Sequence, residues 1–229
     1  MVNRKGGNVL SFIKDLKHDI DSIKARDPAA KNALEIILTY SGVHAVMIYR
    51  LSHALYKRKF LVSARVVSQI GRLLTGIEIH PGAKIGKGLL IDHGSGVVIG
   101  ETAEIGDYCL LYQGCTLGGT GKDTGKRHPT LGNGVMVGCG AKVLGPFKVG
   151  DGAKIAANAV VLSEVPPGAT AVGVPAKVVR MHGRKPAAEE VDQIHIPDPV
   201  EQELCMYKRR LKALEKEVES LKAQIKDER

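Results

Sequence analysis

A period of six residues runs through the middle of the sequence and restricts the possible folds more than any other feature. Between Ile79 and Val161 an apolar residue opens each short unit, and small residues, mostly glycine or alanine, follow it. Neither a helix nor an antiparallel sheet gives this period, whereas a solenoid with three sides of one short strand each does. The pattern predicts a parallel β-helix over residues 77–182, whose corner turns use the surplus of glycine, 27 residues in all. The unit openers are Ile79, Ile85, Ile91, Ile99, Ile105, Leu111, Leu117, Leu131, Val137, Val143, Val149, Ile155 and Val161.

The period is interrupted twice. The first interruption adds two residues beside Asp92 and His93. The second adds eight residues after Leu117, which must leave the coil as a loop that contains Arg127 and His128. Because a solenoid gains little stability from such an extrusion, the loop is predicted to be functional.

The residues before the solenoid carry apolar positions at helical spacing, which predicts an N-terminal helical domain at residues 1–76. Asp27 and Pro28 have the residue types of an N-cap and a first helical position, so a second helix is expected to begin there. Two more amphipathic helices are expected at about residues 43–57 and 60–75.

The solenoid is expected to end near the proline-containing segments Val165–Gly168 and Gly173–Lys177, and residues 183–199 are expected to form a polar linker. Residues 200–229 then show heptads with oppositely charged flanking positions, which predict a C-terminal helix in a parallel coiled coil with copies of itself. A lone helix folded back on the solenoid is the alternative, and a two- or three-stranded coil stays open. The a positions are Leu204, Leu211, Val218 and Ile225, and the d positions are Val200, Tyr207, Leu214 and Leu221.

Charge and cysteine usage suggest the compartment. The net charge of +9 favours anionic partners or simply a soluble surface. The four cysteines form no CxxC pair or zinc signature, and no run of 18 apolar residues occurs. We therefore expect free thiols in a soluble, cytoplasmic protein without membrane or nucleic-acid partners.

A set of motifs occurs in and beside the six-residue units: Glu78–Gly86, Ile91–Gly96, Gly100–Thr102, Leu117–Lys122 and Arg127–Pro129. Together they resemble the motifs of the serine O-acetyltransferases, members of the hexapeptide-repeat acyltransferase superfamily. The resemblance covers about residues 27–180 and implies an α+β fold with a left-handed parallel β-helix, a trimer and acetyl-CoA as donor, without a metal. It also implies acetylation of the L-serine hydroxyl to O-acetyl-L-serine, for cysteine biosynthesis.

The resemblance assigns catalytic roles to His93 and Glu78. A hydroxyl is a poor nucleophile near pH 7, so a base must take its proton, and the resemblance makes His93 that base. Glu78 matches the acidic partner that orients the ring, a position that is Asp in some members.

The resemblance also places four residues around serine: Asp27, Asp92, Arg127 and His128. The planar guanidinium of Arg127 suits the substrate carboxylate, and His128 assists binding or stabilises the oxyanion. Asp27 has an alternative role as a helix cap only.

The repeat register predicts one column of residues, each two positions after the apolar opener on the same side of successive coils. Its members are His93, Gln113, Cys139 and Ala157. The pantetheine arm of acetyl-CoA would pass the small Cys139 and Ala157. Lys154 and Lys177 would meet its phosphates, and Gly119 completes the expected cofactor-binding residues.

Three other functions compete with this interpretation. One is acetylation of another hydroxyl or amine. Another is a β-helical carbonic anhydrase type of site with zinc on His80, His93 and His128. The third is a scaffold in which the heptads carry the function. Trimer or hexamer, kinetic order and the strength of inhibition by cysteine stay open. The end of the sequence, Lys226–Arg229, lacks the isoleucine by which many members bind the next enzyme of the pathway, so that complex is doubtful.

Overall fold

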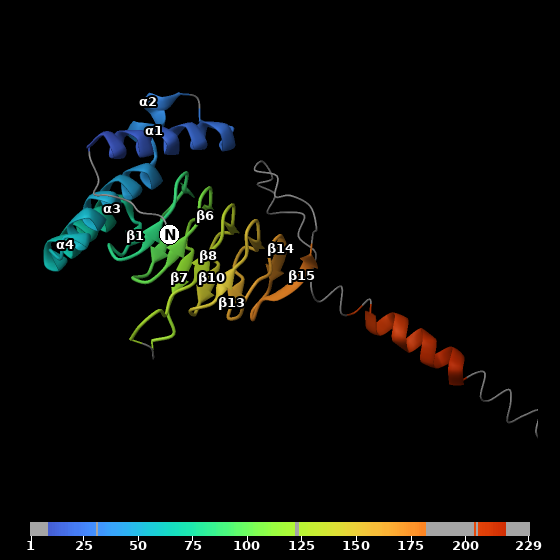
Figure 1. Cartoon of the computed structure of the whole chain (residues 1–229). Helices are drawn as coiled ribbons and strands as arrows, with labels where there is room; N and C mark the ends of the chain where they lie inside the picture. Colours follow the sequence, from blue (N-terminus) through green and yellow to red (C-terminus); the bar gives the residue numbers. More distant parts are fainter. Residues whose placement is uncertain (1–8, 31, 122–123, 182–203, 205, 219–229) are drawn as a thin grey trace, which may run out of the picture.

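The protein consists of N-terminal helices, a solenoid of parallel strands and a C-terminal helix, which confirms the predicted fold class (Figure 1). The computed structural model describes residues 9–30, 32–121, 124–181, 204 and 206–218. No helix among them is long and apolar enough to cross a membrane.

The strands form three sheets, and the chain visits sheets A, B and C in turn on each coil. Sheet A contains β1 (Glu78–Ile79), β4 (Val98–Ile99), β7 (Thr116–Gly118), β10 (Lys142–Leu144) and β13 (Val160–Val161). Sheet B contains β2 (Lys84–Ile85), β5 (Glu104–Ile105), β8 (Thr130–Leu131) and β11 (Lys148–Val149). Sheet C contains β3 (Leu90–Asp92), β6 (Leu110–Tyr112), β9 (Met136–Val137), β12 (Lys154–Ile155), β14 (Ala169–Val172) and β15 (Lys177–Met181). The turns between them define an A/B corner, a B/C corner and a C/A corner.

The residues that open the six-residue units fill the inside of the coil. Ile91 lies beside Leu111, Leu111 beside Val137, and Val137 beside Ile155 on successive coils, as the register predicts. Leu111, Val137 and Ile155 are completely buried. Burial of each such side chain contributes about 1.5–3 kcal/mol, so this stack stabilises the coil substantially.

The parallel pairing ends with β14 (Ala169–Val172), which lies between the two proline-containing segments. The prolines after Val165 lie in a turn, beyond which β14 pairs parallel with β12. The last strand, β15, then pairs antiparallel with β14 and covers its edge. Pro166 and Pro167 therefore do not stop the coil, because they lie in a turn in which the carbonyl of Pro166 accepts a hydrogen bond from the amide of Ala169 at 3.2 Å.

Four helices precede the strands: α1 (Val9–Arg26), α2 (Ala33–Thr39), α3 (Ser41–Lys57) and α4 (Leu61–Thr75). The expected start of the second helix at Asp27 is wrong. Asn32 is the N-cap of α2, and its side chain accepts a hydrogen bond from the amide of Glu35 at 2.8 Å. Asp27 instead accepts a hydrogen bond from the amide of Ala29 at 2.8 Å and holds a tight turn.

Helix α1 is attached to the B/C corner by charged groups. Asp19 accepts a hydrogen bond from the amide of Gly88 at 2.9 Å and pairs with Arg50 of α3 at 2.5 Å. Arg26 donates to the carbonyl groups of Gly88 and Tyr108. These contacts fix the helices against the start of the solenoid, where the candidate site lies.

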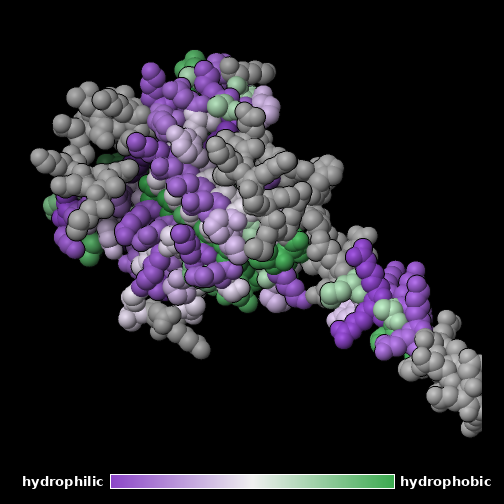
Figure 2. Space-filling model, turned by 45° about the vertical axis from the view of Figure 1, so that its right-hand side comes forward, coloured by the Kyte–Doolittle hydropathy of each residue, from purple (hydrophilic) through white to green (hydrophobic). Residues whose placement is uncertain are grey.

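The C-terminal helix is helical over residues 206–218, and its apolar heptad positions are exposed (Figure 2). Tyr207, Leu211, Leu214 and Val218 are between 48% and 61% exposed, so the described part of the helix does not fold back on the solenoid through this stripe. The predicted linker at residues 183–199 and the last heptads lie outside the described residues.

Candidate active site

The extruded loop lies at the A/B corner, between β7 and β8, and carries Arg127 and His128. The Arg127 guanidinium donates from Nη2 to Oε2 of Glu101, which lies in the turn after β4, at 2.5 Å. The other oxygen of Glu101 accepts a hydrogen bond from the hydroxyl of Tyr56 at 3.2 Å. The bond from Arg127 holds the pKa of the Glu101 carboxyl below its usual value. A chain of polar contacts thus joins α3 to the loop.

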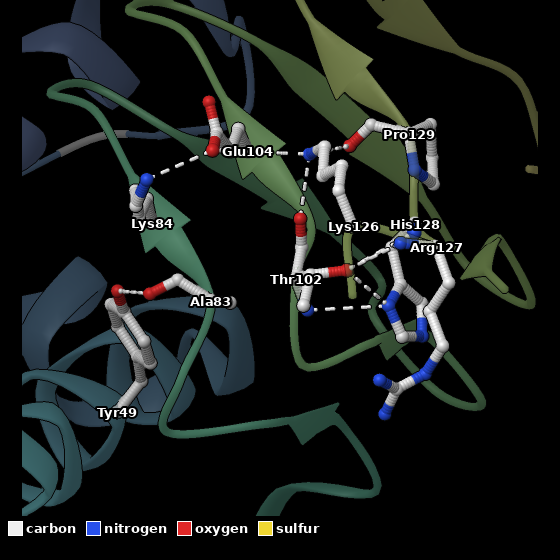
Figure 3. A network of polar contacts seen from close by, with 9 residues as sticks. All are labelled: Tyr49, Ala83, Lys84, Thr102, Glu104, Lys126, Arg127, His128 and Pro129. Atoms are coloured by element: carbon white, nitrogen blue, oxygen red, sulfur yellow. Dashed lines mark hydrogen bonds and ion pairs between the residues drawn. The ribbon is translucent and has the colours of Figure 1, made fainter. Parts of the chain in front are cut away.

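Thr102 is the centre of a second set of contacts in this loop (Figure 3). Its hydroxyl oxygen accepts hydrogen bonds from the amides of Arg127 at 3.0 Å and His128 at 3.2 Å. Nδ1 of His128 lies 2.9 Å from the same oxygen and 3.2 Å from the amide nitrogen of Thr102. The carbonyl of Thr102 accepts from Lys126 Nζ at 2.6 Å. Figure 3 shows the His128 ring turned toward Thr102, while the Arg127 guanidinium points away from it.

His128 fits against the corner because two of its neighbours have no side chain. A β-carbon at Gly100 would overlap the His128 ring, and one at Gly119 would lie 3.2 Å from Nε2. The side chain is consequently buried, with 8% of the residue exposed. Burial, and then the positive charge of Arg127, lowers the pKa of His128.

His93 lies at the C/A corner, directly after β3. It has a left-handed backbone conformation with φ of 58°, which is unfavourable for a residue other than glycine. Its carbonyl accepts from the amide of Ser95 at 2.9 Å, and that of Asp92 accepts from Gly94 at 2.7 Å. The side chain is 75% exposed, with Nε2 4.0 Å from Oδ1 of Asp92. The two extra residues therefore form a bulge that presents His93 to the outside.

The predicted column beginning at His93 is wrong in its first member. The carbonyl of Ser95 accepts from Gly114, which places Ser95 opposite Gln113. The carbonyl of Gln113 accepts in the same way from Gly140, so the column continues to Cys139 as predicted. The two-residue excess shifts the register between β3 and β4, and His93 projects from the bulge beside this column.

The start of α3 brings Asp27 and Asp92 to the same region, because Tyr40 interacts with both carboxylates. A β-carbon at Gly42 would overlap the carbonyl of Ile91, so only glycine lets the helix approach β3 this closely. The neighbouring Tyr40 donates its hydroxyl proton to Oδ2 of Asp27 at 2.7 Å. Burial, together with the negative charges of Asp27 and other carboxylates including Asp92, raises the pKa of Tyr40 to about 12.

Glu78 lies at the start of β1 in sheet A. Its Oε2 is 3.4 Å from Nε of Arg72 in α4, and no recorded contact among the described residues joins it to His93. Its predicted role as the partner of His93 stays a prediction. Asp92 is the carboxylate that the structure places nearest to the His93 ring.

The predicted cofactor residues fall into two groups. Cys139 and Ala157 follow β9 and β12 at the C/A corner, and the carbonyl of Cys139 accepts from the amide after Ala157 at 2.8 Å. Lys154 and Lys177 lie in strands of the adjoining sheet C. Gly119 lies apart from them, at the A/B corner beside Arg127.

The predicted site is therefore divided within one chain. His93, Asp92, Cys139 and Ala157 lie at the C/A corner, whereas Gly119, Arg127 and His128 lie at the A/B corner. The histidines of the zinc alternative are divided likewise, with His80 and His128 at the A/B corner. Within the described ranges no group of three or more His, Cys, Asp or Glu side chains could share a metal ion.

Sequence reasoning did not assign roles to the residues that hold the loop. Glu101 and Thr102 belong to one of the motifs that carry the family resemblance, which was a signal that they matter. Tyr40 and Tyr56 gave no such signal, because their partners Asp27 and Glu101 are distant in the sequence.

Comparison with known proteins decides the family. The chain is 51% identical to the serine acetyltransferase of Bacillus subtilis over 94% of its own length and 96% of that protein. It is 62% identical to the serine acetyltransferase of Helicobacter pylori strain 26695, over 72% of this chain and 96% of that protein. The chain belongs to the serine acetyltransferase family. It is thus an acyltransferase that acetylates serine.

Two further comparisons agree with membership of the serine acetyltransferase family. Residues 128–163 match the family model described as bacterial transferase hexapeptide (six repeats). A solved serine acetyltransferase in complex with cysteine superposes with a TM-score of 0.79 at 42% identity, covering 82% of this chain and 73% of that chain. The enzyme of Vibrio cholerae gives 0.78 at 39% identity, with coverage of 81% and 72%.

Proposed function

We propose that the enzyme transfers acetyl from acetyl-CoA to the L-serine hydroxyl with His93 as general base. His93 takes the hydroxyl proton as the serine oxygen attacks the thioester carbon. The new C–O bond replaces the C–S bond, and the imidazolium returns its proton to the departing CoA sulfur. O-acetyl-L-serine and CoA are the products, and the metabolic role is cysteine biosynthesis in the cytoplasm.

The observation that carries this proposal is the exposed bulge at His93. An unfavourable backbone conformation with a mostly exposed ring contributes little to stability, which is typical of a residue kept for chemistry. Asp92 at 4.0 Å supports orientation of the ring, and Glu78 is proposed as the second acid.

We propose that each active site is formed by two subunits of a homotrimer. The carboxylate anchors Arg127 and His128 lie at a different corner of the coil from His93, so a neighbouring copy must bring its A/B corner to the C/A corner of the first. Asp27, which accepts a hydrogen bond from Tyr40, and Asp92, whose charge also acts on Tyr40, would supply negative charge for the serine ammonium group.

Acetyl-CoA would lie along the C/A corner of the coil. The corner beyond His93 offers the small residues Cys139 and Ala157, which leave room for the pantetheine arm. Lys154 and Lys177 in sheet C suit the phosphates, and Gly119 of the neighbouring subunit would face the arm.

The C-terminal helix is proposed to form a parallel coiled coil at one end of the trimer. Leu211, Leu214 and Val218 have exposed apolar side chains at heptad spacing, and self-association would bury them. A hexamer remains the alternative assembly, in which α4 supplies a further apolar contact. Its exposed residues are Val62, Val66, Ile70 and Leu73.

Acceptor choice tests the reaction. A coupled assay of thiol release from acetyl-CoA, with serine, homoserine, threonine and sugar acceptors, should show serine favoured by at least about 100-fold in kcat/KM. Equal use of a sugar or an amine would favour the alternative acyltransferase. His93→Ala should lower turnover by about 10²–10⁴-fold with an unchanged circular dichroism spectrum. His18→Ala is the control with normal turnover, because His18 is a half-buried residue of α1 that contacts Tyr108 at the B/C corner.

Mixed oligomers test the shared site. Arg127→Ala should mainly raise KM for serine, so the assay uses serine well below that KM, where His93→Ala and Arg127→Ala subunits are each expected to be nearly inactive alone. Refolding them together should restore sites that combine an intact His93 with an intact Arg127. Recovery of about a quarter of parent activity is the expected order of magnitude for random mixing. No recovery, with mixed trimers present by mass spectrometry, would place both residues in one subunit's site.

Removal of residues 200–229 tests the scaffold alternative. Transferase activity should survive, while light scattering shows a change in assembly. Loss of all activity from a folded, trimeric truncated protein would instead give the heptads the principal function.

A further inference from the structure

The hydrogen bonds around Thr102 determine where its hydroxyl proton must go. A hydroxyl group has one proton to donate and two lone pairs with which to accept. Both lone pairs are used, because the amides of Arg127 and His128 donate to this oxygen at 3.0 Å and 3.2 Å. The proton is left for the remaining neighbour, Nδ1 of His128, at 2.9 Å.

A second donor points at the same ring nitrogen. The backbone amide of Thr102, which can only donate, lies 3.2 Å from Nδ1 of His128. Two donors on Nδ1 leave no place for a proton there, so a neutral His128 carries its proton on Nε2.

The charges around the ring also favour its neutral form. Arg127 and Lys126 are positive and act against protonation, whereas Glu101 acts in the opposite direction and is itself bonded to Arg127. A flipped ring would place the carbon Cδ2 instead of Nδ1 before the two groups of Thr102, so these hydrogen bonds also determine which ring nitrogen faces Thr102.

We propose that Thr102 is a positioning residue, which fixes His128 as the neutral tautomer with a proton on Nε2, a hydrogen-bond donor to a negatively charged oxygen of the substrate. The tautomer follows from the contacts alone. The use of the Nε2 proton rests on the proposed role of His128 in the serine site. Thr102 also holds the backbone of Arg127, so one hydroxyl group sets both side chains of the loop.

The tautomer is measured by nitrogen-15 NMR of the full-length protein with labelled histidine. The His128 signals are assigned by their loss in His128→Gln. Long-range proton–nitrogen correlations should show an unprotonated Nδ1 and a protonated Nε2 from pH 6.5 to 8. A proton on Nδ1, or a charged ring at pH 7, would overturn the proposal.

Two substitutions at one position separate the hydroxyl group from the rest of the side chain. Thr102→Val keeps the shape but removes the donor and both acceptor sites, while Thr102→Ser keeps all three. We expect Thr102→Val to raise the pH at which His128 becomes protonated and to lower kcat/KM for serine by about 10–100-fold. Thr102→Ser should remain within about threefold, and Thr116→Val, a half-buried threonine of sheet A, is the matched control.

The readouts distinguish failure of this proposal from failure of the proposed function. If His128 becomes protonated at the same pH in Thr102→Val and in Thr102→Ser, the hydroxyl group of Thr102 does not set the tautomer, whatever the activity of the two variants. If the NMR result holds but His128→Leu, which has no donor at the position of Nε2, keeps parent kcat/KM, the ring is held as described and its role toward serine is wrong. A loss of activity shared by Thr116→Val would mark a general effect on the coil and overturn the positioning role.

Discussion

Arg127 and Glu101 form an ion pair at 2.5 Å, in which Glu101 also accepts a hydrogen bond from Tyr56. The proposed anchor of the substrate carboxylate is therefore already held by a carboxylate of the protein. Because the bond uses Nη2, Glu101 orients the guanidinium and leaves its remaining N–H groups for the substrate.

Glu101→Gln should raise KM for serine by about fivefold, with a smaller change in kcat. The substitution keeps an acceptor oxygen but removes the charge, which weakens the hold on Arg127 by roughly 1 kcal/mol. Steady-state kinetics measure this effect. Glu164→Gln is the control, since Glu164 is exposed in the turn after β13, two coils beyond the loop, and should change KM by less than twofold. An unchanged KM in Glu101→Gln would mean that Glu101 does not orient Arg127, and a lower KM would mean that it competes with serine.

Gly42→Ala should destabilise the protein by about 1–3 kcal/mol, because the new methyl group meets backbone at Ile91. Gly71→Ala is the control: its β-carbon would lie 2.9 Å from a methyl group of Ile48, a side chain that can move. Thermal unfolding followed by circular dichroism compares the two. Equal melting temperatures would show that α3 can shift away from β3 at little cost.

Acid should destabilise the parent protein more than His128→Gln. The pKa of His128 is lowered in the folded protein, mainly by burial, so the unfolded chain takes up the proton first as pH falls. The stability is complete above about pH 6.5 and decreases below it. Melting temperatures at pH 8 and pH 5.5 measure the difference, and an identical decrease in both proteins would contradict it. His80, whose pKa is also lowered, is present in both proteins and cancels.

Thiol labelling should distinguish the cysteines of the coil. Burial raises the pKa of Cys109 and of Cys115 to about 11, so both should resist iodoacetamide in the native protein. Cys139 is partly exposed and should react, and CoA should protect it if the pantetheine arm passes there. Peptide mass spectrometry in a Cys205→Ser background reads out each site. Equal labelling of Cys139 with and without saturating CoA would contradict the proposed path.

The sequence predicted the coil well because its inward positions obey one local rule. Ile91, Leu111 and Val137 are buried wherever they lie along the solenoid, so their period alone reports the fold. The same rule failed at His93, since two extra residues can be absorbed in a corner in more than one way.

The supporting contacts of the site were beyond sequence reasoning for a different reason. Asp27 has a residue type that suits a helix cap and a tight turn equally, and only tertiary packing chose the turn. The roles of Thr102 and Glu101 depend on a loop that returns across the corner about 25 residues later, and no local pattern encodes that return.

Backbone hydrogen bonds join Gln113, Cys139 and Ala157 along the C/A corner, and their regular spacing is relevant to the length of the cosubstrate that can bind there. Each coil adds about 4.8 Å along the axis, so on the proposed path of acetyl-CoA the stack sets the distance between the thioester and the phosphates. Insertion of one extra coil between Cys139 and Ala157 would lengthen that distance by about 4.8 Å without altering the residues at either end.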